Sequence, residues 1–418
     1  MLTLAKYSLG TGDRFGHQAK AQLRASVLAR AEGLEIVPVW NKSNREHTLI
    51  GSEPASVREA AACAVSELGW NHPWHVDADH INMGTVDRFL EPSDFFTIDV
   101  ADFIGKPPAA SDVDDFIWRH PELSGRVEVP GIAESFATTS DTIRSIAFKF
   151  LFAVQEAGRI YRHIASRKGA DNFITEVSMD ETDVHQNPVD LLVILAAIAD
   201  EKIPLQTIAP RFPGRFNKGV DYVGDVDCFA GEFSKDLAVL AFAARQYALP
   251  NLKLSLHSGS DKFSIYGPIN RVLRETGAGL HVKTAGTSWL EELIGLAEAG
   301  GNGLVAVKEI YREAWKQRET LCAPYAAVID IDSGKLPDPD AFSQWDSETV
   351  AATVRHQPSC LRFNSSVRQL LHVAFKLGAK MGPRYLLLLD EYEPLITRNV
   401  TNNLLERHIR PLFGYPGV

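Results

Sequence analysis

The sequence predicts an α/β protein built on a single (β/α)8 barrel of the TIM type. Two observations support this fold class. Short runs of β-forming residues alternate with longer helix-like segments through the first three quarters of the chain, and eight such short runs occur. Eight strand–helix units fit a closed barrel, although an open, doubly wound parallel sheet has the same local pattern and stays an alternative.

The bulk composition fits one large globular unit. A chain of 418 residues is longer than a typical domain, but α/β barrels often run this long as one domain. The net charge of −10 excludes a global positive field that would attract nucleic acid or an anionic membrane. The longest apolar runs, Leu191–Ala199 and Leu237–Ala244, are too short to cross a bilayer.

The N-terminus lacks the basic and apolar segments of a signal peptide. Cys63, Cys228, Cys322 and Cys360 lie far apart, without a C-x-x-C pair, so we expect free thiols rather than disulfides or a zinc finger. These features together predict a cytoplasmic protein without membrane or nucleic-acid partners.

The eight predicted strands are Leu4–Leu9, Glu35–Trp40, Pro73–Asp77, Phe95–Asp99, Asn172–Val177, Pro204–Ala209, Leu252–His257 and Gly279–Lys283. The predicted helices among them are Gly16–Ala31, Ala55–Leu68, Thr138–Arg167, Pro188–Asp200, Glu232–Gln246, Gly267–Glu275 and Ser288–Ala299. The pair Asn187-Pro188 is a typical helix start, with a capping side chain before a proline.

Two regions depart from this alternation. Residues 101–137 form a predicted insertion after the fourth strand, which we interpret as a lid-like segment of the barrel domain, residues 1–325. Residues 326–418 predict a mainly helical extension packed on the barrel. Its predicted elements are one strand-like run, Ala326–Asp332, and the helices Ser347–Arg355, Ser366–Met381 and Asn399–Ile409.

Reactive side chains follow several predicted strands, where the active site of a barrel lies. Glu176, His257 and His281 come from three different strand ends, and two imidazoles with one carboxylate can bind a divalent cation such as Zn, Ni, Mn or Co. Alternatively, one of these histidines only forms a hydrogen bond to a neighbouring carboxylate.

Other side chains at the strand ends are candidates for acid–base catalysis. Asp77, Asp79 and His80 follow the third strand and could also supply a fourth metal ligand. Lys283 ends the eighth strand, where it could act as a Schiff-base nucleophile in a mechanism without metal.

Cationic groups near the barrel mouth are candidates for substrate binding. Arg14, Arg211 and Lys262 lie in loops after the first, sixth and seventh strands, where they could bind a carboxylate or remain solvated. The loop Gly10–Gly16 could also cradle an anion or form only a tight turn. His17, which follows it, is a further candidate to bind substrate.

The sequence resembles the tagaturonate epimerase family of hexuronate catabolism. The resemblance lies in the segments Ser8–His17, His75–Asn82, Glu176–Asp183, Leu256–Phe263, His281–Thr287 and Val328–Asp332. It implies an epimerase that interconverts fructuronate and tagaturonate, and related enzymes act on fructose and tagatose. The expected partner is thus a small ketose or keto-uronate, and a homo-oligomer is compatible with the sequence.

The two uronates differ at a carbinol carbon β to the ketone, whose C–H bond the carbonyl does not acidify. Transient oxidation by a nicotinamide would need a dinucleotide fingerprint, which the sequence lacks. Retro-aldol cleavage of the adjacent C–C bond, assisted by a divalent metal, fits the residues better. The alternatives are a sugar isomerase or ketose 3-epimerase that works by enediol proton transfer, and a non-catalytic sugar-acid binding protein.

Overall fold

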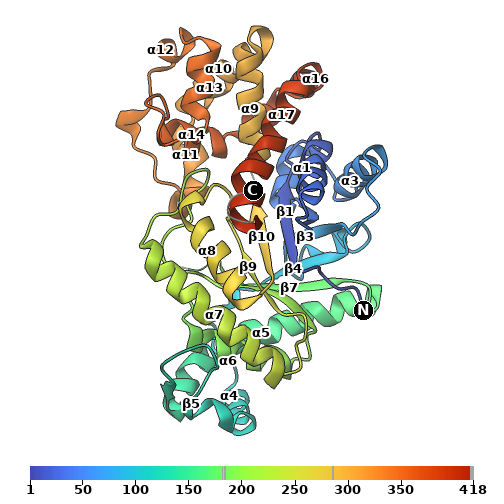
Figure 1. The fold of residues 1–418 in the computed structure, drawn as a ribbon, viewed down its shortest axis with the longest axis vertical. Coiled ribbons are helices and arrows are strands. Elements are labelled where there is room, and N and C mark those ends of the chain that lie inside the picture. The colour runs from blue at the N-terminus through green and yellow to red at the C-terminus, as the bar shows by residue number, and fades with distance from the viewer. Residues whose placement is uncertain (181, 183–184, 285–286, 415–418) are drawn as a thin grey trace.

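Eight parallel strands close into a barrel in the computed structural model of the chain (Figure 1). The structure describes residues 1–180, 182, 185–284 and 287–414. The order around the barrel is β1-β10-β9-β8-β7-β4-β3-β2, which confirms the closed barrel over the open sheet. The strands are β1 (Tyr7–Gly12), β2 (Val37–Asn41), β3 (His75–Ile81), β4 (Phe95–Asp99), β7 (Ile174–Ser178), β8 (Leu205–Ala209), β9 (Lys253–Leu256) and β10 (Leu280–Thr284).

The first strand begins later than predicted because the preceding residues close the bottom of the barrel. The backbone N–H of Leu4 donates to Gln206 Oε1, and Gln206 Nε2 donates to the carbonyl of Leu2. Leu4 packs in a buried apolar cluster with Phe95 and Ile174. This apolar floor leaves only the opposite, carboxyl end of the barrel polar and accessible.

Helices surround the barrel, and all of them except α2 lie in predicted places. They are α1 (Ala19–Ala31), α2 (Asn44–Ile50), α3 (Ala55–Glu67), α5 (Ser140–Lys168), α6 (Pro188–Asp200), α7 (Val226–Gln246), α8 (Phe263–Thr276) and α9 (Thr287–Ala299). Helix α6 begins as predicted, because Asn187 accepts hydrogen bonds from the N–H groups of Val189 and Asp190 with Pro188 in the first turn. Only the 3-10 helix Val86–Arg88 connects β3 to β4.

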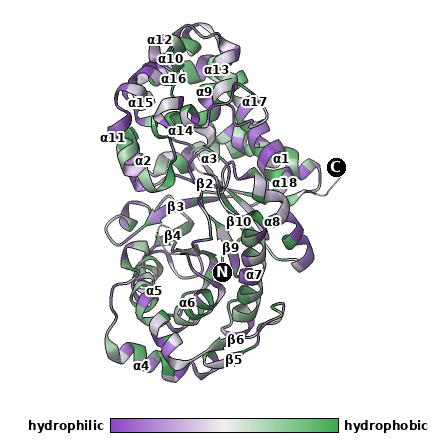
Figure 2. Ribbon diagram, turned by 90° about the vertical axis from the view of Figure 1, so that its left-hand side faces the viewer, coloured by the Kyte–Doolittle hydropathy of each residue, from purple (hydrophilic) through white to green (hydrophobic). Residues whose placement is uncertain are grey.

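The insertion between β4 and α5 contains α4 (Ala110–Arg119) and the antiparallel pair β5 (Gly125–Val127) and β6 (Phe136–Thr138). Its contacts are with outer helices: Arg119 pairs with Asp200 at the end of α6, and Tyr247 after α7 donates to Glu122. In Figure 2 this subdomain lies at the opposite end of the molecule from the C-terminal helices. A lid function stays a prediction.

The C-terminal region is helical and packs against α1 and α9 (Figure 1). Its helices are α10 (Gly301–Lys316), α11 (Arg318–Cys322), α12 (Pro339–Ser343), α13 (Ser347–Val354), α14 (Ser365–Val373), α15 (Phe375–Lys380), α16 (Pro383–Glu391), α17 (Glu393–Leu404) and α18 (Arg410–Phe413). A π-helix, Leu405–Ile409, joins α17 to α18. The division of the chain at residues 325 and 326 stays a prediction.

The predicted strand Ala326–Asp332 is wrong. Residues Ala323–Val328 form a 3-10 helix, and the N–H of Asp330 bonds to the side chain of Gln369 instead of to a neighbouring strand. The carbonyl of Val328 accepts a hydrogen bond from the N–H of Lys218. The alternating apolar residues therefore dock the segment on surrounding loops rather than on a sheet.

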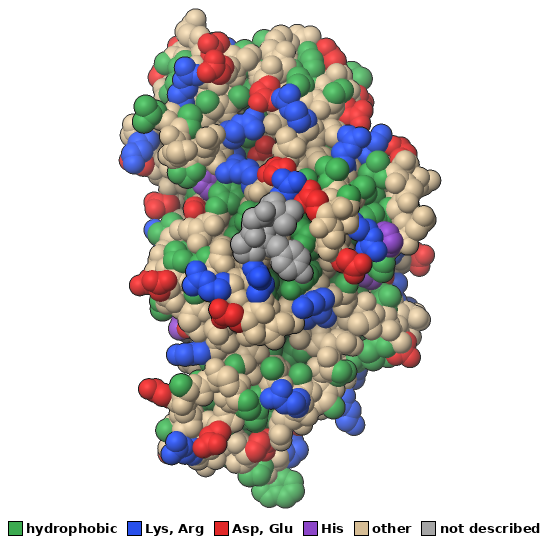
Figure 3. Space-filling model, in the orientation of Figure 1, with side chains coloured by type: hydrophobic (Ala, Val, Ile, Leu, Met, Phe, Trp, Pro, Cys, Tyr) green, Lys and Arg blue, Asp and Glu red, His purple; other side chains and the backbone are tan. Residues whose placement is uncertain are grey.

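The molecular surface carries a mixture of apolar, acidic and basic side chains. Figure 2 colours most helices in alternating green and purple, and Figure 3 shows acidic and basic side chains interspersed over one face. In the part of the chain that the structure describes, no helix is long and apolar enough to cross a membrane.

Candidate active site

Two adjoining cavities open at the carboxyl end of the barrel. Their volumes are about 440 and 290 Å³, and we call them the outer and the inner cavity. Among the described lining residues, both share Arg45, Asp180, Lys218, His257, Ser258 and Tyr325. The inner cavity is also lined by Asp79, His80, Asp99 and Lys283, which lie in or just after barrel strands.

A distortion of β3 turns His80 into the inner cavity. Strict alternation would place His80 on the opposite face of the strand from Asp79. The register of β3 against β4 shifts between Ala78 and Ile81, and His80 has a φ of +52°. Left-handed backbone costs energy in a residue with a Cβ atom and is concentrated at functional sites. The distortion places Asp79 and His80 side by side.

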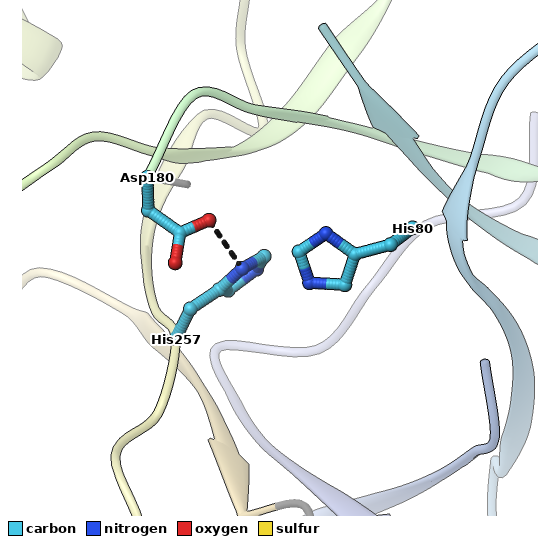
Figure 4. A group of neighbouring side chains, drawn as sticks. All are labelled: His80, Asp180 and His257. Atoms are coloured by element: carbon cyan, nitrogen blue, oxygen red, sulfur yellow. Dashed lines mark hydrogen bonds and ion pairs between the residues drawn. The ribbon is translucent and has the colours of Figure 1, made fainter. Parts of the chain in front are cut away.

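His80, Asp180 and His257 form a compact group, in which each side chain offers one ligand atom within 4.8 Å of the others (Figure 4). His257 Nδ1 lies 2.9 Å from Asp180 Oδ1, and His80 Nδ1 lies 3.3 Å from Asp99 Oδ2. Burial lowers the pKa of His257, but Asp180 and Glu176 outweigh it and raise the value to about 9. The group thus combines two imidazoles and one carboxylate at the boundary of the two cavities.

Glu176 orients His257 from below. The fully buried carboxylate places Oε1 2.7 Å from His257 Nε2 and accepts a hydrogen bond from Thr207 at Oε2. Burial opposes the charge, but Lys283 and His257 hold the pKa of Glu176 well below its usual value. Glu176 is therefore an ionised acceptor that fixes the orientation of the imidazole.

Lys283 lies among three carboxylates. Its Nζ is 2.7 Å from Asp77 Oδ2, 2.9 Å from Asp79 Oδ1 and 3.2 Å from Glu176 Oε1. Burial opposes the ammonium charge, but these neighbours raise the pKa of Lys283 well above its usual value. A Schiff-base nucleophile must be a neutral amine, so this environment favours an electrostatic function instead.

The pKa values of the two aspartates beside Lys283 are shifted in opposite directions. Burial raises the pKa of Asp77 to about 6, whereas for Asp79 the charge of Lys283 outweighs burial and lowers the pKa to about 2. Asp79 lines the inner cavity, and Asp77 lies behind it against Thr97. Asp79 is thus the carboxylate of the pair that lies at the cavity wall and stays ionised to lower pH.

His281, a predicted metal ligand, lies deeper in the barrel. It precedes Lys283 by two residues on the same strand face, its Nδ1 lies 2.8 Å from Ser8 Oγ, and its ring packs on Phe95. Burial lowers its pKa to about 3. The structure brings Glu176 and His257 together as predicted, but His80 and Asp180, not His281, complete the compact group.

The predicted substrate-binding residues from the first loop lie at different depths. Arg14 lines the inner cavity, stacks its guanidinium on Phe375 and lies 3.4 Å from Glu46. His17 is not among the described residues that line either cavity, and its Nε2 is 3.5 Å from Asp390 at the protein surface. The structure gives no contact that supports substrate binding by His17.

Arg211 and Lys262 also differ. Arg211 lines the outer cavity, and its guanidinium donates a long hydrogen bond of 3.5 Å to the carbonyl of Asp180. Lys262 is buried and donates to the carbonyls of Asn217, Val220 and Ser260. All three of its N–H groups are used by the protein, so Lys262 is not available to grip a substrate in this structure.

Sequence reasoning missed several residues of the site. Asp180 and Asp99 follow strands in the same way as the predicted residues, so the strand-end rule could have assigned them. Arg45, Lys218, Tyr325 and His372 lie on helices or loops without a motif, and the sequence gives no signal for them. Glu181, Asp183, Ala285 and Gly286 of the family segments lie outside the described residues.

A closed barrel whose carboxyl-end cavity gathers carboxylates, imidazoles and ammonium groups defines a (β/α)8-barrel enzyme. The model of the family UxaE, tagaturonate epimerase, matches residues 1–408, and the chain belongs to this family. It is therefore an epimerase, in the isomerase class of enzymes.

Individual relatives are similar to this chain over most of its length. The chain is 27% identical to the tagaturonate/fructuronate epimerase of Thermotoga maritima over 97% of its own length and 81% of the relative's length. Two crystal structures of the fructuronate-tagaturonate epimerase UxaE from Cohnella laeviribosi, native and with one glycerol, are similar to it in fold. Their TM-scores are 0.80 and 0.81 and their identities 23% and 22%, over 99% and 98% of this chain and 82% of each crystal chain.

Proposed function

We propose that this epimerase interconverts fructuronate and tagaturonate, with fructose and tagatose as weaker substrates. The main observation that supports this proposal is the family match over residues 1–408. The site supports it, since acid–base groups line the inner cavity and cationic groups line the outer one. Action in the cytoplasm and assembly into a homo-oligomer stay predictions.

We propose that a divalent cation, such as Zn, Ni, Mn or Co, binds at His80, Asp180 and His257. The donor set fits, because two imidazoles and a carboxylate suit these metals. His80 holds Nδ1 against Asp99 and His257 holds Nε2 against Glu176, so the second nitrogen of each ring would bind the cation. At His257 the cation would replace the hydrogen bond between Nδ1 and Asp180. A cation bound there would polarise the substrate ketone and stabilise negative charge on its oxygen.

The chain's own residues then supply the proton transfers of a retro-aldol epimerisation. Asp79 accepts the proton of the β-hydroxyl group, and the C–C bond between this carbon and the α-carbon breaks to give an aldehyde and an enediolate, which keeps the electron pair of the broken bond. The ammonium group of Lys283, 2.9 Å from Asp79, stabilises the developing oxyanion by its positive charge.

Epimerisation requires that the aldehyde turn and present its other face before the C–C bond re-forms. A second group must then return a proton to the oxygen at its new position. Asp99 lines the same cavity, with one oxygen paired with His80, and we propose that its other oxygen carries the proton that is donated in this step. Exchange with solvent then removes the proton from Asp79 and returns one to Asp99. The enclosed site would keep the two fragments together between cleavage and re-formation.

The experiment is incubation of the purified protein with tagaturonate after metal analysis, with products separated by chromatography. We expect fructuronate as product, loss of turnover on chelation with an unchanged helical circular-dichroism signal, and recovery on adding the metal back. Loss of the helical signal on chelation would indicate a structural ion. Absence of any sugar conversion by the metal-loaded protein would favour a binding protein.

Variants test the assignment of the metal ligands separately from activity. We expect Asp180→Ala and His80→Ala to lower the metal content per protein chain, whereas His17→Ala, at the surface, leaves it unchanged. Reaction in D₂O tests the mechanism. Deuterium incorporated at the carbon next to the ketone during the first turnover would support the rival enediol proton-transfer enzyme.

A further inference from the structure

Lys218 lies at the centre of the site but takes no part in the proposed proton transfers. It lines both cavities, and its Nζ donates to Ser258 Oγ at 3.2 Å, directly beside His257 in sequence. Ser258 has a φ of +50°, so this turn is itself held in an uncommon conformation. The ammonium group therefore contacts the residue that directly follows His257, which lies in the reaction centre.

The backbone around Lys218 is fixed at every residue. Lys262 Nζ donates to the carbonyls of Asn217 and Val220, and Arg368 Nε donates to the carbonyl of Gly219. The N–H of Lys218 itself donates to Val328. Since the loop is held by hydrogen bonds on both sides of Lys218, ligand binding need not order it.

Gly219 adds a local requirement for this loop conformation. Its φ is +72°, and a Cβ atom there would lie 3.3 Å from the ring of His372 and 3.4 Å from Leu290. The chain turns sharply after Lys218 at a place where a side chain would be strained.

The surrounding charges favour an anion in the outer cavity. Among its described lining residues are the cations Arg45, Arg211 and Lys218 and a single carboxylate, Asp180, which is paired with His257. The inner cavity, in contrast, is also lined by the carboxylates of Glu46, Asp79 and Asp99. Its additional cations already have protein partners, since Arg14 lies beside Glu46, Lys283 beside Asp79, and Lys262 donates to backbone carbonyls.

We propose that Lys218, assisted by Arg211 and Arg45, binds the carboxylate of the sugar acid in the outer cavity. The inference deepens the proposed function and rests on it. The carboxylate of a keto-uronate lies at the opposite end of the molecule from the ketone. If the ketone binds at the boundary of the two cavities, the carboxylate therefore reaches into the outer cavity, toward these cations. Lys218 is thus the residue that distinguishes a uronate from a neutral ketose.

The test compares Lys218→Gln and Lys218→Arg with the wild-type protein. We expect Lys218→Gln to lower the ratio of kcat/KM for tagaturonate to kcat/KM for tagatose by about 10- to 100-fold, because a charge-assisted hydrogen bond is lost. Lys218→Arg should restore most of the ratio. Lys308→Gln is the matched control, since Lys308 is also half-buried, donates to one carbonyl and is absent from the described cavity linings.

A binding measurement separates this proposal from the proposed function. The dissociation constants of galactonate and of the neutral galactitol, measured by calorimetry, need no turnover. Tighter binding of galactonate that Lys218→Gln abolishes would support the anion subsite even if tagaturonate is not converted, which would refute only the proposed function. Equal losses on acid and neutral ligands, or no loss on either, would overturn the assignment of Lys218.

Discussion

Two buried lysines follow adjacent strands of the barrel, and their surroundings are opposite in kind. Lys283 at the end of β10 lies among the carboxylates of Asp77, Asp79 and Glu176, which raise its pKa well above the usual value. Lys262 after β9 donates to three uncharged carbonyls with its ammonium group, and burial lowers its pKa to about 7 although the charge of Asp261 opposes this shift. The nearest carboxylate to Lys262 in sequence, Asp261, is instead paired with Arg368 at 2.6 Å.

The difference shows that a buried cation near a cavity is not by itself a catalytic or binding group. Lys283 shares its carboxylates with the acid–base machinery, so its charge reaches the reacting atoms. Lys262 uses its donors to fix the loop that carries Lys218. The neighbours of each ammonium group, not its position at a strand end, indicate its function.

The largest effect is expected from Lys283→Met. Removal of one partner from a buried ion cluster leaves uncompensated charge, so we expect a loss of roughly 3–5 kcal/mol in the free energy of unfolding. Turnover should fall by at least about 100-fold, because the developing oxyanion and Asp79 lose their positive neighbour. Urea denaturation and kcat/KM for tagaturonate measure the two effects.

The double variant Asp77→Asn with Lys283→Met provides the control. Neutralising one of the three carboxylates should restore part of the stability but none of the turnover. If stability does not recover, repulsion among these carboxylates is not the cause of the lost stability. Lys283 would then be closer to Lys262 in function than we infer.

A smaller effect is expected from Lys262→Met. Three buried carbonyls lose their donor, so the free energy of unfolding should fall by roughly 1–3 kcal/mol. Because Lys262 holds a loop and does not read the substrate's charge, kcat/KM should fall by the same factor for tagaturonate and tagatose. Steady-state kinetics on both sugars, with Lys308→Met as a control, measures this. A selective loss on tagaturonate would return Lys262 to the group of substrate-binding residues.

The sequence predicted the barrel and the ring of polar residues at its mouth because both arise from local patterns. Strand–helix alternation is visible in one dimension, and the carboxyl ends of parallel strands meet in space. This rule placed Asp79, His257 and Lys283 at the mouth, where they line the inner cavity, whereas Glu176 lies behind His257.

The depth of each side chain in the barrel could not be predicted, because it depends on the stagger of neighbouring strands. His281 and Lys283 lie two residues apart on one face, so only one of them can reach the mouth. The bulge that turns His80 inward depends on how β3 pairs with β4. The predicted metal set therefore shares only His257 with the group His80, Asp180 and His257, since Glu176 lies behind His257 and His281 lies in the layer below.

Lys218 was beyond prediction for a different reason. It lies in an irregular loop between β8 and α7, and the groups that hold this loop, Lys262, Val328 and Arg368, are distant from it in sequence. The predicted strand at Ala326–Asp332 failed for the same reason, since its backbone bonds to that loop and to Gln369 rather than to a sheet.

The smallest effect at neutral pH is expected from His281→Gln, which sharpens the comparison within β10 itself. Burial lowers the pKa of His281 from 6.5 to about 3. Between these values the unfolded chain binds the additional proton, so the contribution of His281 to stability is complete above pH 6.5 and is lost as the pH falls toward 3. The slope from this group approaches about 1.4 kcal/mol per pH unit. His408, whose pKa burial lowers to about 4, adds a similar slope that both proteins retain.

Urea midpoints measured from pH 7.5 to pH 4 should therefore fall less steeply for His281→Gln than for the wild-type protein. Parallel curves would mean that His281 is protonated in the folded barrel and shares the carboxylates of Lys283, which would remove the distinction in depth between them.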